Sequence, residues 1–135
     1  MIEPKVDWLP DDSFNFVDYN RIQDNMIELI ELTERYFGTN DWVHMNQKTS
    51  YSDVLYAEEF NALERNLRLI NESTVNADIG EEKVYASNDR TPDYKEFNRI
   101  EQAQLLLFER IMIHVKNSQH LAYELGQTPI SYREV

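Results

Sequence analysis

The chain has 135 residues and a net charge of −12, from 25 acidic and 13 basic residues. Hydrophobic residues make up 41% of it and aromatic residues 12%, which predicts one globular domain with a single core rather than a disordered acidic tail. Because there is no cysteine, disulfides, thiolate metal sites and cysteine nucleophiles are excluded, and the negative charge disfavours direct binding of nucleic acid or anionic lipid.

Residues 1–13 predict an irregular arm, because aromatic and apolar side chains alternate there with prolines and acids. Such an arm either packs along its own domain or inserts into a neighbouring protein. We expect Phe14 and Phe16 to pack internally. For Trp8 both interpretations stay open, and it is a candidate interaction anchor.

The first helix is expected over residues 14–37, where apolar side chains recur at steps of three and four. Asp11, Asp12 and Ser13 are candidate caps before it, and Gly38 is a natural end. In the polar segment that follows, Trp42 with its apolar neighbours is expected to hold a loop against the helices. Trp42 is therefore a second candidate anchor.

Two further amphipathic helices are expected near residues 53–73 and 92–117. Thr91 can cap the last one and Pro92 fits its first position. Between them, residues 83–87 alternate in a way that suggests a short extended segment. From Ala122 the helical period is lost, and Gly126 and Pro129 follow, so residues 122–135 are expected to be extended. The prediction is a mainly α protein: a three-helix bundle over 14–117 with an N-terminal arm and an extended C-terminal tail.

One short sequence motif, which we call the phrase, occurs at the start of all three expected helices: DYNRIQ from Asp18, EFNALE from Glu59 and EFNRIE from Glu96. Asparagine is a poor helix former, so its repetition at Asn20, Asn61 and Asn98 needs a reason. We interpret the three amides as structural latches that fix a neighbouring loop or helix end. The alternative is that they line a ligand or partner site.

Motifs of enzymes are not found in the chain. His44, His114 and His120 fit no metal-binding spacing, and with three glycines in all there is no phosphate-binding or dinucleotide-binding loop. Paired acids are common, but a chain with 25 acids contains such pairs by chance. We expect no catalytic, cofactor or metal residues, and no membrane segment, because the apolar run at residues 105–108 is too short to span a bilayer.

Several motifs in a fixed order resemble a known family, over about residues 4–110. They are Asp7 and Trp8, Phe14 and Asn15, Asp18 to Ile22, Tyr56, Phe60, Asn61, Glu64 and Asn66, Ile79 and Gly80, Arg90 to Asp93, and Asn98 to Glu101. In these the chain resembles small proteins encoded among the tail and baseplate genes of phages and prophages of Gram-positive bacteria. The resemblance implies a non-enzymatic structural or adaptor protein of the virion tail, present in the host cytoplasm during assembly.

On that interpretation the partners are other tail or baseplate proteins and further copies of the same chain. Candidate anchors for such contacts are aromatic: Trp8, Trp42, Tyr123 and Tyr132. The alternative function is a small acidic inhibitor that imitates DNA and occupies a host nucleic-acid-binding protein. Arginines interleave with the acids along the expected helices, which is less typical of a DNA mimic.

Overall fold

The computed structural model describes residues 1–45, 57–86 and 92–124, with side chains as far as Gln119 in the last range. It contains three helices, α1 (Phe16–Tyr36), α2 (Ala57–Ser73) and α3 (Tyr94–Glu124), and no strand within the described residues. All three pack against one another. The prediction of a mainly α three-helix bundle is confirmed. Within the described part of the chain no helix is long and apolar enough to cross a bilayer.

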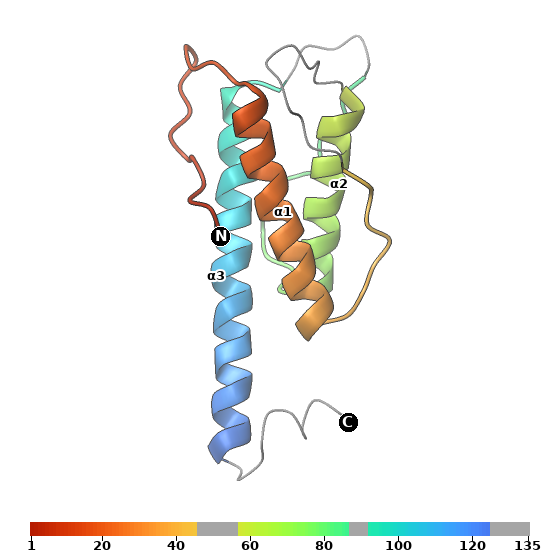
Figure 1. Cartoon of the computed structure of the whole chain (residues 1–135), viewed down its shortest axis with the longest axis vertical. Coiled ribbons are helices and arrows are strands. Elements are labelled where there is room, and N and C mark those ends of the chain that lie inside the picture. The colour runs from red at the N-terminus through yellow and green to blue at the C-terminus, as the bar shows by residue number, and fades with distance from the viewer. Residues whose placement is uncertain (46–56, 87–91, 125–135) are drawn as a thin grey trace.

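The three helices run in the same direction (Figure 1). Their first turns lie together, since the ring of Phe60 on α2 is 6.1 Å from that of Tyr19 on α1 and 6.3 Å from that of Phe97 on α3. A parallel bundle needs connections that return along its whole length, and both connections, 37–56 and 74–93, have 20 residues. Twenty extended residues reach about 66 Å, well beyond the roughly 25 Å of α2. The repeated phrase therefore marks one end of the bundle.

The core is built in layers by equivalent positions of the phrase. The aromatic residues Tyr19, Phe60 and Phe97 form the first layer, and the aliphatic residues Ile22, Leu63 and Ile100 form the next; all six are at most 5% exposed. Phe14, from the end of the arm, stacks on Phe97 at 4.0 Å between ring centroids and so covers the first layer. The expected internal packing of Phe14 is thus observed.

The helix starts differ from the sequence prediction in their caps. Asn15, rather than Asp11, Asp12 or Ser13, caps α1: its Oδ1 accepts from Val17 N, while Asp18 accepts from Asn15 N, which makes a reciprocal capping box. At α3, the Asp93 carboxylate accepts from the backbone N–H of Lys95 and Glu96. Pro92 therefore precedes the cap instead of occupying the first helical position, and Thr91 lies outside the described residues.

The helix ends also differ. Gly38 follows the last turn of α1 with φ of +126°, and its N–H donates to Thr33 O, as expected for a glycine after a helix. α3, however, continues to Glu124, so the expected end at 117 was wrong, and so was the expected extended conformation of residues 122–124. Residues 118–124 contain no Gly or Pro; the apolar period fades there because α1 and α2 have ended, not because the helix has. Residues 125–135 lie outside the described part.

Candidate functional site

The repeated asparagines bind backbone. Asn98 Oδ1 accepts from Trp8 N at 2.7 Å and Asn98 Nδ2 donates to Trp8 O at 3.0 Å. Asn61 does the same with Tyr85, at 2.6 Å and 2.9 Å. We call such a two-bond contact between one amide and the backbone of one residue an amide latch. Only an amide has a donor and an acceptor spaced like those of a peptide group, which is why these positions are Asn rather than Asp.

Three further amide latches hold the non-helical segments. Asn25 binds Ile2, Asn66 binds Val43 and Asn71 binds Ala77, each by both its oxygen and its nitrogen within 3.0 Å. Asn20, the first asparagine of the phrase, is half-buried and is likewise engaged rather than free. The latches therefore fix the arm and both connections against the helices. The geometry of Asn61 and Asn98 agrees with the structural interpretation of the repeated amide.

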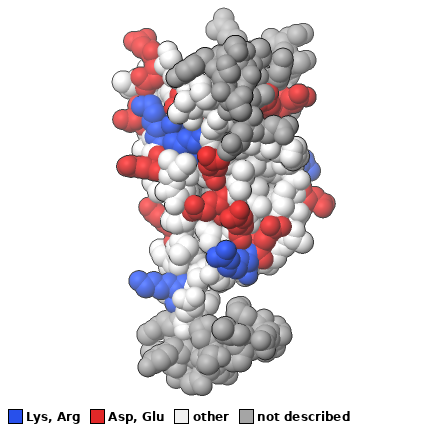
Figure 2. Space-filling view, in the orientation of Figure 1, with Lys and Arg blue, Asp and Glu red and all other residues white. Residues whose placement is uncertain are grey.

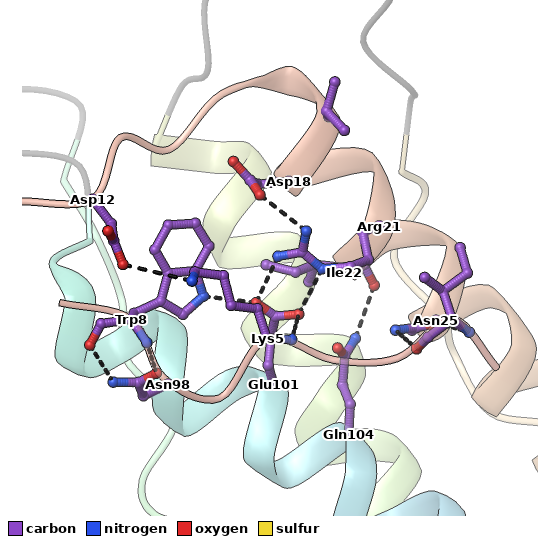
Figure 3. A network of polar contacts seen from close by, with 12 residues as sticks. Lys5, Trp8, Asp12, Asp18, Arg21, Ile22, Asn25, Asn98, Glu101 and Gln104 are labelled. Atoms are coloured by element: carbon purple, nitrogen blue, oxygen red, sulfur yellow. Dashed lines mark hydrogen bonds and ion pairs between the residues drawn. The ribbon is translucent and has the colours of Figure 1, made fainter.

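The last residue of the phrase is a buried acid on α3. Glu101 is fully buried and accepts hydrogen bonds from Lys5 N, from the indole Nε1 of Trp8 and from Arg21 (Figure 3). The Arg21 contact is bidentate, and its hydrogen bond to Glu101 raises the pKa of the guanidinium. Both oxygens of Glu101 are thus bonded within the chain. The carboxylate is a structural acceptor rather than a group held open for a ligand.

Glu64 is the equivalent acid on α2 and has an equivalent set of partners. It is 1% exposed, accepts from the Tyr85 hydroxyl at 2.9 Å and from Lys83 N, and forms an ion pair with Arg99. Burial raises the pKa of the Glu64 carboxyl, and the charge and hydrogen bond of Arg99 offset part of that effect. Burial and the nearby Glu64 also raise the pKa of the Tyr85 phenol.

The two networks are related by a rotation of the bundle. The residue after the phrase asparagine is Arg21 on α1, which pairs with Glu101 on α3, and Arg99 on α3, which pairs with Glu64 on α2. The same step from α2 to α1 would join Ala62 to Gln23, and both are buried. Where the arginine is replaced by alanine, the buried acid is replaced by the neutral glutamine. We therefore interpret the bundle as approximately threefold, with two charged stations, the ion pairs Arg21–Glu101 and Arg99–Glu64, and one neutral station, Ala62 and Gln23. The Oε1 of Gln23 is buried without a hydrogen-bond partner among the described residues.

The candidate anchors have different environments. Trp8 is 3% exposed, with its ring 5.3 Å from that of Phe97 and its Nε1 bonded to Glu101. The expectation that it anchors a partner is therefore corrected, because the ring has no free face. Trp42 is half-buried on the core and donates from Nε1 to Glu34. The side chain of Tyr123, and Tyr132 as a whole, lie outside the described residues.

Groups for chemistry are not brought together in the described part of the chain. His44 is exposed, and the ring of His114 lies against Phe37 at 4.8 Å; the side chain of His120 is outside that part. No group of three or more His, Asp or Glu that could hold a metal is found among the residues described. The strongest polar constellation among the described residues is the set of latches and buried ion pairs, whose atoms bind one another apart from Arg99 Nε, which is buried without a hydrogen-bond partner in that part of the chain.

Several residues of this network do not stand out in the sequence. Asn25, Asn66 and Asn71 do not share the phrase, and Glu64 and Glu101, although they end it, differ in no local feature from the many other acids of the chain. One signal could have found the acids: each lies three residues after the phrase asparagine, on the apolar face that includes Leu63 or Ile100. An acid at a core position predicts a buried partner of opposite charge.

Comparison with protein-family models, curated proteins and solved structures finds no match for the chain.

Proposed function

We propose that the protein is a non-enzymatic structural or adaptor component of a phage tail or baseplate, which acts through protein–protein contacts. The proposal starts from the resemblance described above. We call the amide latches and the two buried ion pairs, with the segments that they hold, the frame. The observation that supports the proposal is that the residues carrying the resemblance include residues of this frame: Trp8, Arg21, Asn61, Glu64, Gly80, Asn98, Arg99 and Glu101. A motif that fixes segments in place suits a protein that works by presenting a fixed structure to its partners rather than by catalysing a reaction.

The rigidity of the frame suits such a role. In the described part of the chain, five amide latches and two buried ion pairs hold segments that are up to 90 residues apart. A component that occupies a fixed place in an assembly must present its surfaces in one arrangement, and pre-organised surfaces lose less entropy on binding. Buried polar networks that are well satisfied favour a single arrangement.

The alternative is an acidic inhibitor of a host nucleic-acid-binding protein, and the net charge of −12 favours it. Acidic and basic side chains are interspersed over the face shown in Figure 2. Arg68 bridges Glu72 and Glu82, and Arg21 and Arg99 are bound to buried acids. A DNA mimic needs an uninterrupted acidic row, so the interspersed charges support the adaptor proposal more than the inhibitor.

Mass spectrometry of purified virions, from the phage or induced prophage that encodes the chain, tests the proposal. We expect the protein in particles at a fixed ratio to the other tail proteins, and tails or baseplates that are defective by electron microscopy when its gene is deleted. A protein missing from virions that binds a host nuclease tightly would reject the adaptor role and support the inhibitor.

A further inference from the structure

α3 extends beyond both of its neighbours (Figure 1). Aligned on the repeated phrase, the end of α1 at Tyr36 corresponds to His114 on α3, and the end of α2 at Ser73 corresponds to Arg110. The part of α3 that follows has no equivalent in the other two helices. It departs from the approximate threefold symmetry, so the frame does not explain it.

The surface of α3 that lies beside the end of α1 and continues past it exposes apolar side chains. Ile113 is 56% exposed and Met112 is 39% exposed, and both lie on a shallow groove of one helix face. We call it the α3 groove; it is lined by Phe108, Glu109, Met112, Ile113, Val115, Lys116 and Gln119. Large apolar side chains that sit together on a helix surface, rimmed by charges, are typical of a contact with another helix.

The local charge permits contact with a second copy. Residues 102–119 contain one acid, Glu109, and two bases, Arg110 and Lys116, in a chain whose net charge is −12. Two such chains repel each other over most of their surfaces, and least where the local charge is close to zero. Within the part of the chain that the structure describes, the side chains of Glu109 and Lys116 make no hydrogen bond or ion pair.

The spacing of these two charges is self-complementary. Glu109 and Lys116 are seven residues apart, which is about two helical turns, so they share one line along α3. Met112 and Ile113 lie midway between them, on either flank of that line. If a second α3 packs antiparallel about a twofold axis at this midpoint, Glu109 of each copy faces Lys116 of the other.

From this geometry we infer that the α3 groove binds the α3 groove of a second copy, giving an antiparallel, twofold-symmetric homodimer. Met112 and Ile113 pack on their own equivalents at the axis, and two Glu109–Lys116 ion pairs flank them. A partner without this charge order would leave one charge of each pair unmatched. The inference does not depend on a role in a phage tail. A single helix pair buries a small area, so the dimer is expected to be weak and concentration-dependent.

Sedimentation equilibrium of the full chain over a range of concentrations tests the dimer. The wild type should show a monomer–dimer equilibrium. Ile113→Glu, which places two like charges at the axis, should weaken dimerisation at least about tenfold. Val84→Glu is the matched control: Val84 is 78% exposed, in the segment latched near the other end of the bundle, and its replacement should leave the equilibrium unchanged. Circular dichroism checks that both variants remain helical.

Exchange of the two charges tests the orientation. Glu109→Lys alone and Lys116→Glu alone place like charges face to face, and each should weaken dimerisation at least about tenfold. An equimolar mixture of the two variants should dimerise again, because every facing pair is then of opposite charge.

Two results would overturn the inference: a wild type that stays monomeric at all concentrations, and an equal dimer in every variant. If the full chain is monomeric, a chain ending at Glu124 that dimerises would show that residues 125–135 prevent the contact.

Discussion

Arg21 on α1 and Glu101 on α3 are joined by two parallel hydrogen bonds, Nε to Oε1 at 2.9 Å and Nη2 to Oε2 at 2.8 Å. Glu101 is fully buried, so its charge depends on this contact for compensation. Arg99 on α3 forms the equivalent ion pair with Glu64 on α2. A phrase that occurs three times along the chain thus produces the same contact twice, because all three helices start at the same end of the bundle.

The amide latch at Asn98 can be tested by truncation. Asn98→Ala removes both hydrogen bonds to Trp8 and leaves the backbone N–H and C=O of Trp8 without partners. This change should lower the free energy of unfolding by about 1 to 3 kcal/mol. Asn117→Ala is the control, because Asn117 is exposed on the same helix, and its replacement should be neutral or slightly stabilising. Urea denaturation of both variants measures the difference. Equal costs would mean that the latch contributes nothing.

The fold could be predicted from the sequence because the apolar period and the repeated phrase both report on helix faces. The three helices and the role of Asn61 and Asn98 followed from that period and from the poor helix propensity of Asn. The direction of the helices did not follow, since the period is the same for parallel and antiparallel neighbours. The ion pairs of Glu64 and Glu101 depend on that direction, so they could not be predicted either.

Trp8 shows a second limit of the sequence. An aromatic side chain in an irregular arm has the same local pattern whether it packs on its own bundle or on a neighbour. Its burial is decided by Asn98 and Glu101, 90 and 93 residues away, which bind its backbone and its indole. The continuation of α3 to Glu124 shows a third limit, because a helix without neighbours has no apolar period to reveal it.

Gly80 should tolerate no side chain. Its φ is +83°, and a Cβ there would lie 2.9 Å from Cδ of Arg99. Gly80→Ala should therefore destabilise the protein by about 1 to 3 kcal/mol, through backbone strain and displacement of Arg99. Gly38→Ala separates the two effects, because Gly38 also has positive φ but an added Cβ would meet no atom within 4 Å. Thermal melts that place Gly80→Ala no lower than Gly38→Ala would contradict a role for the contact with Arg99.

The buried carboxyl of Glu64 gives the stability a defined pH dependence. Burial raises its pKa in the folded state, so folding favours the protonated form. The stability from this group is present below its unfolded pKa and is lost as the pH rises through the folded pKa. The stability of the wild type minus that of Glu64→Gln should therefore fall as the pH rises above the ordinary pKa of a glutamate carboxyl, about 4.3. A difference that rises with pH would mean that Arg99 outweighs burial.

The first aromatic layer should account for a large share of the stability. Phe60→Ala and Phe97→Ala each truncate a buried ring where two or three helices meet, and each should cost about 3 to 5 kcal/mol. Val17→Ala, at a position that is 51% exposed on α1, should change the melting temperature little. If both phenylalanine variants melt within a degree or two of the wild type, the packing of the first layer is assigned wrongly.

The central claim is that the charged and neutral stations of the bundle are interchangeable versions of one contact, and a double-mutant cycle at Arg99 and Glu64 tests it most directly. Arg99→Ala alone should lower the free energy of unfolding by about 3 kcal/mol, because it leaves a buried carboxylate without its counter-charge. Adding Glu64→Gln reproduces the pair found at Ala62 and Gln23, and should restore at least half of that loss. A double variant as unstable as the sum of its single changes would contradict the claim.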